Sequence, residues 1–169
     1  MGEHNEKPFE KELALYLESQ GWLYSPTGAG YDKERALFPE DVFGWLADTQ
    51  PKALAKVVKP GDAASVQAKA REALLDRLVK ALDAPFEGIA GVYGGTLSVL
   101  RRGFKFTPVS LRMAQFKPAD ALNPSTTADY GKMRLRVMRQ VFYSTTSKKS
   151  IDLVFFVNGL PVATLEPED

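Results

Sequence analysis

Two apolar runs, Ile151–Val157 and Leu160–Leu165, meet at Asn158-Gly159. Asn-Gly between runs of β-prone residues is a strong signal for a tight β-hairpin. Both runs are apolar at nearly every position, which predicts strands buried on both faces, as in the centre of a sheet. Asp152 lies within the first run and Glu166 closes the second. Because a buried carboxylate costs free energy unless a cation meets it, the pattern indicates either a metal ion or a basic side chain at this hairpin.

The spacing of the two carboxylates constrains the turn. Residues that face each other across a hairpin project to the same face of the sheet. A two-residue loop would place Glu166 on the face opposite Asp152. A three-residue loop, with Val157 included and Gly159 left-handed as a bulge, would pair Asp152 with Thr164 and make the two carboxylates diagonal neighbours on one face. We therefore predict an odd-length loop or a bulge in this hairpin, as a shared metal site requires.

Helical periodicity dominates the first half of the chain. Pro8–Gln20 predicts an amphipathic helix that ends at Gly21, a good residue for a helix C-terminus. Pro39 to about Ala47 predicts a second helix, with Pro at its first turn. A third helix is expected after Asp62, a candidate N-cap, because one stripe at helical spacing follows it: Val66, Ala70, Leu74, Leu78 and Leu82.

The second half reads mainly as strands. Thr96–Phe106 predicts a strand or hairpin and Arg112–Phe116 a short strand, whereas Asn123-Pro124 predicts the start of a short helix that runs towards Tyr130. The glycine-rich stretch Gly88–Gly95 is interpreted as a loop, since no G-x-x-x-x-G-K-[ST] pattern occurs in the chain. Arg134–Tyr143 predicts a strand that joins the hairpin in a three-stranded antiparallel unit.

These elements predict a single α/β (α+β) domain of 169 residues. Residues 1–24 hold the first core helix, residues 25–130 form an inserted α/β region, and residues 131–169 form the three-stranded sheet. The composition, 44% hydrophobic and 25% charged, is that of an ordinary soluble globular protein. We find neither a run long enough to span a membrane nor a signal peptide.

The lack of cysteine and the presence of a single histidine exclude several kinds of catalytic and metal site. The chain has no cysteine, which excludes disulfides and thiolate zinc sites and fits a cytoplasmic location. Its single histidine, His4, lies near the N-terminus, which argues against a Ser-His-Asp triad and a histidine metal site.

Positive charge is concentrated in one segment. Residues 101–149 contain eleven Lys and Arg against two Asp and Glu, a surplus of nine, although the whole chain has a net charge of only +1. Such a segment is typical of a surface that contacts a polyanion. The alternative is an internal counter-surface for the acidic first hundred residues. Candidate phosphate contacts are Arg101, Arg102, Arg134, Arg136, Arg139, Lys148 and Lys149.

Many of these segments, in this order, resemble the N-terminal nuclease region of the restriction (R) subunit of type I restriction–modification enzymes. The resemblance rests on FEKELALYLESQGW, YDKERALFPEDVFGWL, LLDRLVKALD, LSVLRRGFKF, RLRVMRQVFYS and SIDLVFFVNGLPVATLE, and it covers most of the chain. It implies a PD-(D/E)xK restriction-endonuclease-like core, in which a mixed central sheet is flanked by helices.

The resemblance also implies a site. The first acidic residue of the motif falls on Asp152 and the glutamate of E-x-K on Glu166. A glutamate of the first helix, Glu10 or Glu12, is expected to approach the metal. The implied cofactor is Mg²⁺, a hard ion that prefers oxygen ligands, polarises a phosphate and lowers the pKa of bound water.

The chain departs from the pattern after Glu166. The position of the E-x-K lysine is occupied by Glu168, which could add a metal ligand but repels phosphate. Three interpretations are open. The chain is a truncated or frameshifted fragment; or it is a degenerate copy kept for binding or assembly; or it is an active variant whose cation comes from Lys148, Lys149 or Arg139.

Three functional hypotheses follow. The first is a Mg²⁺-dependent endonuclease that cleaves double-stranded DNA, and the second is a DNA-binding or assembly module of the same fold without cleavage. In the third, Asp152 is a structural carboxylate that pairs with Arg139. The resemblance implies specificity and methylation subunits as partners of this chain. It also implies that ATP is used only by a helicase motor, which lies further along the polypeptide in the intact family.

Overall fold

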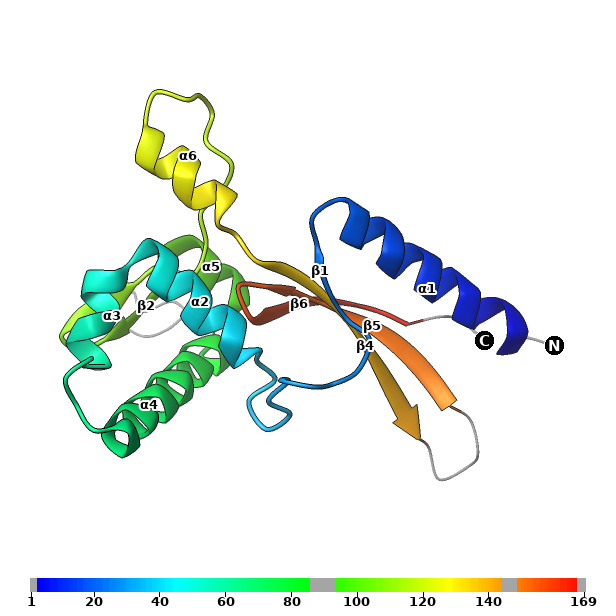
Figure 1. The fold of residues 1–169 in the computed structure, drawn as a ribbon, viewed down its shortest axis with the longest axis horizontal. Helices are drawn as coiled ribbons and strands as arrows, with labels where there is room; N and C mark the ends of the chain where they lie inside the picture. The colour runs from blue at the N-terminus through cyan, green and yellow to red at the C-terminus, as the bar shows by residue number, and fades with distance from the viewer. Residues whose placement is uncertain (1–2, 86–93, 144–148, 167–169) are drawn as a thin grey trace.

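The computed structural model describes residues 3–85, 94–143 and 149–166, which form a mixed α/β fold. A central sheet lies between the N-terminal helix on one side and a lobe of several helices on the other (Figure 1). The elements in order are α1 (Glu3–Ser19), β1 (Leu23–Ser25), α2 (Pro39–Thr49), α3 (Pro51–Val57), α4 (Ala64–Asp83), α5 (Thr96–Arg102), β2 (Phe104–Phe106), β3 (Val109–Leu111), α6 (Pro124–Gly131), β4 (Leu135–Tyr143), β5 (Lys149–Val157) and β6 (Leu160–Leu165).

The central sheet has the strand order β1-β4-β5-β6. Strands β4, β5 and β6 form the predicted antiparallel unit, and β1 adds a parallel strand beside β4, so the sheet is mixed as expected. Strand β5 is central, and its Leu153 and Phe156 are almost fully buried on opposite faces. None of the helices in the described ranges combines the length and apolar character needed to cross a membrane.

Helix α1 ends as its sequence predicts. Gly21 has φ +96°, a left-handed conformation that side chains with a Cβ rarely adopt. The backbone nitrogen of Trp22 donates to Leu17 O, and that of Gly21 donates to Glu18 O. This is a Schellman motif, which satisfies carbonyls at the helix end and directs the chain into β1. The ring of Trp22 then packs edge-on against Phe155 of β5.

The lobe of α2–α5 and the β2–β3 hairpin contains the larger hydrophobic core. Trp45 of α2 and Leu78 of α4 are fully buried there together with Leu111 of β3. Trp45 Nε1 donates to the carbonyl oxygen of Arg112 at 2.8 Å, so the largest core side chain also satisfies its polar atom. Leu160, at the start of β6, belongs to the same core and connects the sheet to the lobe.

Residues 96–102 form helix α5, so the prediction of a strand from Thr96 was wrong for this part. Ser98 and Val99 are buried while Arg101 and Arg102 are exposed, as on a helix with one packed side. Gly103 ends the helix at φ +73°, where an added Cβ would lie 2.0 Å from Leu111 O. Gly103 is therefore the residue of the sequence that could have indicated the end of a helix before strand β2.

Two other predictions for the lobe were wrong. Arg112–Phe116 is not a strand. The backbone of Arg112 is hydrogen-bonded to the side chain of Gln50 instead of to a neighbouring strand: Gln50 Oε1 accepts from Arg112 N, and Gln50 Nε2 donates to Arg112 O. Helix α4 has Ala63 at its N-cap rather than Asp62, and no side-chain cap bond. By contrast, the predicted cap of α6 is confirmed, since Asn123 Oδ1 accepts from the backbone nitrogens of Ser125 and Thr126.

Candidate functional site

The turn between β5 and β6 is a two-residue loop with a separate bulge. Val157 pairs with Leu160 across Asn158-Gly159, so of the two predicted forms, an odd-length loop or a bulge, the loop is not the one found. The register then shifts between Phe155 and Phe156, because their partners in β6 are Ala163 and Pro161 and leave Val162 as the extra residue. The predicted bulge is therefore confirmed, but it lies within β6 instead of in the loop.

The bulge brings Asp152 and Glu166 to the same face of the sheet. The last pair of the ladder is Leu153 with Leu165, and the next positions along the two strands are Asp152 and Glu166. The two carboxylates are thus directly opposite one another, rather than diagonal neighbours. Without the extra residue, alternation would have sent them to opposite faces.

The two carboxylates have different environments. Asp152 is only 6% exposed, whereas Glu166 is exposed at the end of an edge strand. The expectation that both strands are buried on both faces therefore holds for β5 and was wrong for β6. Burial raises the pKa of the Asp152 carboxyl above its usual range, and the negative charge of Glu166 raises it further. A cation beside the pair would oppose both effects.

The other acidic candidates do not complete a cluster. Glu10 is buried in α1 and Glu12 is exposed on the same helix, but in the described ranges no three carboxylates group closely enough to hold a metal ion. Glu168 lies outside the described residues. The part of the site that the structure describes is therefore the pair Asp152–Glu166.

Arg136 has an internal role that the sequence did not predict. Its Nε and Nη2 atoms donate to the two carboxylate oxygens of Asp41 at 2.6 and 2.9 Å, and its Nη1 donates to Ser25 Oγ at 2.7 Å. Its guanidinium also lies 4.7 Å from the centre of the Phe38 ring. Because Asp41 is fully buried, this bidentate pair joins α2 to the sheet. The guanidinium is thus engaged inside the domain, where phosphate contact would compete with Asp41.

Arg134 is held in the same region but is more exposed. Its guanidinium lies within 3.7 Å of Asp41 and 3.4 Å of Asp48, and it packs against the backbone of Gly44. The shared contact with Asp41 shows that Arg134, which directly precedes β4, and Arg136 project to the same side of the sheet. The sequence did not indicate Asp41 as their partner, because an acidic residue in the first turn of a helix is already favoured by the helix dipole.

Arg139 does not pair with Asp152. Arg139 is opposite Leu153 in the ladder, whereas Asp152 is opposite Gln140, so the two side chains project to opposite faces. The structural hypothesis of an Asp152–Arg139 pair was therefore wrong, and Arg139 is also poorly placed to supply a cation at the carboxylates. Gln140 is the polar neighbour of Asp152 that sequence reasoning missed.

The remaining basic candidates are distributed over two places. Arg101 and Arg102 are exposed in the last turn of α5, on the helical lobe. Lys148 lies outside the described residues, and so does the side chain of Lys149, whose backbone begins β5. Their roles as phosphate contacts stay predictions.

The comparisons with known proteins give one family match. Residues 4–167 match the model of the family described as the N terminus of the type I restriction enzyme R protein. No curated protein gives a significant match. No solved structure does either.

Proposed function

The chain belongs to the family of type I restriction enzyme R protein N-terminal domains, and on this premise we propose that it is a DNA endonuclease domain in which Asp152 and Glu166 bind Mg²⁺. The fold would be of the PD-(D/E)xK class. Its substrate would be double-stranded DNA, within a restriction–modification complex of several subunits.

The observation that carries the proposal is the convergence of Asp152 and Glu166. The bulge at Val162 aligns a buried carboxylate with a second carboxylate across the strand pair. Burial raises the pKa of Asp152 and the charge of Glu166 raises it further, so the ionised pair is unfavourable for the fold at neutral pH. A divalent cation between the carboxylates would turn this repulsion into attraction.

The donor set fits Mg²⁺. This ion prefers oxygen ligands and is usually held by one or two carboxylates, with water and substrate phosphate at its other positions. When bound, it would polarise the scissile phosphate and lower the pKa of a bound water. Asp152 would provide a buried, fixed ligand, because its backbone lies within the sheet, and Glu166 would provide an exposed ligand at the side from which DNA approaches.

A second candidate function is DNA binding or complex assembly without cleavage. The observation that favours it is Glu168, which stands where the family pattern has a lysine that offsets charge developing in the reaction. Arg139 projects to the other face of the sheet from Asp152. In this case Arg101, Arg102, Lys148 and Lys149 would contact phosphates. Specificity and methylation subunits would select the site, and ATP would act only through a helicase motor.

A nicking assay tests the proposal. Supercoiled plasmid is incubated with the protein in Mg²⁺ or Mn²⁺, and Asp152→Asn and Glu166→Gln are compared with the matched surface variants Asp62→Asn and Glu18→Gln. We expect metal-dependent nicking that both site variants lose and both controls keep. Titration calorimetry with Mg²⁺ should show heat of binding for the wild type and none for Asp152→Asn.

The alternative outcomes distinguish the two functions. No nicking, together with DNA binding that falls steeply with salt and is unchanged in Asp152→Asn, would establish the binding module. Nicking that persists in both site variants would show that Asp152 and Glu166 are not the metal ligands.

A further inference from the structure

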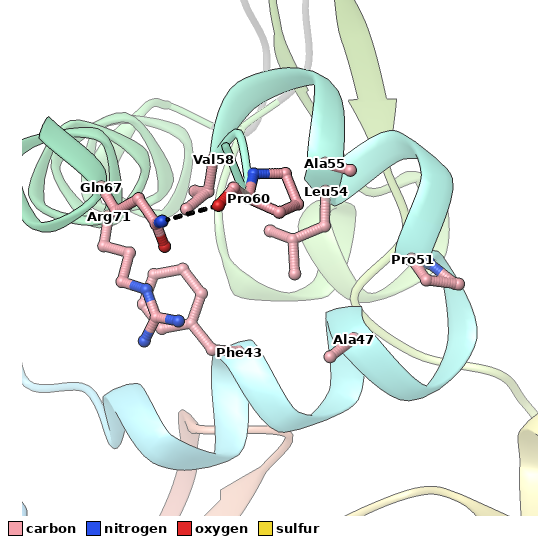
Figure 2. A pocket seen from close by; sticks show the side chains of 9 residues that line it. All are labelled: Phe43, Ala47, Pro51, Leu54, Ala55, Val58, Pro60, Gln67 and Arg71. Atoms are coloured by element: carbon pink, nitrogen blue, oxygen red, sulfur yellow. Dashed lines mark hydrogen bonds between the residues drawn. The ribbon is translucent and has the colours of Figure 1, made fainter. Parts of the chain in front are cut away.

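A pocket opens between α2, α3 and α4, on the lobe and apart from the two carboxylates. It has a volume of about 200 Å³ and is lined mainly by apolar residues: Phe43, Ala47, Pro51, Leu54, Ala55, Val58 and Pro60, with Gln67 and Arg71. Figure 2 shows Phe43 from α2, Leu54 from α3 and Arg71 from α4 around the same space. A hollow of this kind accepts a large apolar side chain, because filling it removes apolar surface from water.

The polar groups at the mouth of the pocket are fixed. The guanidinium of Arg71 lies 5.1 Å from the centre of the Phe43 ring, a cation–π contact between two residues of the lining. Gln67 Nε2 donates to the carbonyl oxygens of Pro60 and Asp62, which holds the chain between α3 and α4 against the helix. The pocket is therefore preformed, which lowers the entropic cost of binding.

The surroundings of the pocket are positively charged on the α3 side. Lys59 lies between the lining residues Val58 and Pro60, and Lys56 follows Ala55; both lysines are exposed. In the described ranges, neither they nor Arg71 forms a salt bridge, whereas Arg35, Arg112, Arg134 and Arg136 all do. These cations are thus available to a partner. In the sequence, Asp62 is the acidic residue closest to the two lysines, and Glu72 directly follows Arg71.

A second hollow, of about 400 Å³, lies on the other side of the Phe43–Arg71 pair, since both residues line it too. Its lining includes three carboxylates, Asp32, Glu40 and Glu72. Arg35 pairs with Asp32 and Glu72 and offsets part of this negative charge, but the side of Lys56 and Lys59 is the more favourable one for an acidic ligand. The charges therefore favour the first pocket over the second hollow as the binding place of a negatively charged partner.

From the apolar lining and these charges, we propose that the α2–α3–α4 pocket docks an acidic segment of a partner protein, which inserts one large apolar side chain between Phe43 and Leu54. Its carboxylates contact Arg71, Lys56 and Lys59. The proposal does not rest on nuclease activity, because the pocket shares no residue with the Asp152–Glu166 pair.

A random peptide library displayed on phage, selected against the whole chain, tests the proposal. We expect enriched peptides in which acidic residues flank one aromatic or leucine residue. Fluorescence polarisation then measures a selected peptide against two variants. Ala47→Trp fills the pocket from an exposed position, and the double variant Lys56→Glu/Lys59→Glu reverses its charge. Each should weaken binding about tenfold or more.

The control is Lys69→Glu/Lys80→Glu, which makes the same change in net charge on α4 outside the pocket lining. It should change affinity less than about twofold. The apolar residue of the peptide, replaced by alanine, should also lose binding. A basic consensus, a failure to enrich any peptide, or binding that is unchanged in Ala47→Trp would each overturn the proposal.

Discussion

The backbone nitrogen of Arg134 donates a hydrogen bond to Oδ1 of Asn158 at 2.7 Å, and the backbone nitrogen of Asn158 donates in return to the carbonyl oxygen of Arg134. Asn158 Nδ2 donates to the carbonyl oxygen of Met113 at 2.9 Å, and the whole residue is buried. Asn158 therefore connects the hairpin both to the start of β4 and to the lobe through buried hydrogen bonds.

Asn158→Ala should destabilise the domain by about 2–4 kcal/mol. It leaves the buried N–H of Arg134 and the carbonyl of Met113 without their partners, and alanine is strained at the φ of +48° found here. Urea denaturation measures the loss. Asn123→Ala, which removes only an exposed helix cap, is the matched control and should cost about 1 kcal/mol. Equal losses of unfolding free energy in the two variants would show that the buried hydrogen bonds of Asn158 contribute no more than an exposed helix cap.

Gly159→Ala should also be strongly destabilising, by about 2 kcal/mol or more. Gly159 has φ +85°, and an added Cβ would lie 2.5 Å from both Phe38 O and Val42 Cγ2. The carbonyl oxygen of Gly159 also accepts a hydrogen bond from the backbone nitrogen of Phe38, the N-cap residue of α2. A shift of the turn would therefore break this contact as well. Gly61→Ala, with open space around its Cβ, should be close to neutral in the same denaturation assay.

Asp41→Ala tests the internal role of Arg136. Removing the buried carboxylate leaves a guanidinium that is largely out of water without its partner, which should cost about 3–5 kcal/mol. Thermal and urea unfolding measure it, with Asp62→Ala as an exposed control. If Arg136 instead served DNA, Arg136→Ala would weaken DNA binding and leave the unfolding free energy unchanged.

The raised pKa of Asp152 predicts a pH dependence of stability. Because the folded chain binds this proton more tightly than the unfolded chain, the contribution is complete below the ordinary value of 3.8 and is lost as pH rises through the raised pKa. Asp152→Asn should therefore melt at a higher temperature than the wild type at neutral pH. The difference should vanish below about pH 3.8. A variant less stable than the wild type at neutral pH would contradict the inferred environment.

Glu166→Gln separates the two causes of that shift. It removes the neighbouring charge but not the burial of Asp152, so the pKa of Asp152 should fall and still remain above its usual range. Carboxyl chemical shifts followed by NMR across a pH titration measure the change. An Asp152 pKa unaffected by Glu166→Gln would show that the two carboxylates do not interact.

Local chemistry made several elements predictable. Gly21 ends α1, Asn123 caps α6 and Asn158-Gly159 makes the hairpin, because each depends on the conformational preference or hydrogen bonding of one or two residues. The helix at residues 96–102 was missed, since the alternation of Phe104, Lys105 and Phe106 directly after it is typical of a strand and was extended back to Thr96.

The sequence by itself determined that the hairpin must contain one extra residue if Asp152 and Glu166 are to share a face, since strand side chains alternate with a period of two. Only the tertiary structure decided that Val162 is this residue, that β6 is an edge strand, and that Arg136 pairs with Asp41. Periodicity is encoded within a few neighbouring residues. The partner of a buried charge ninety-five positions away depends on how the whole chain packs.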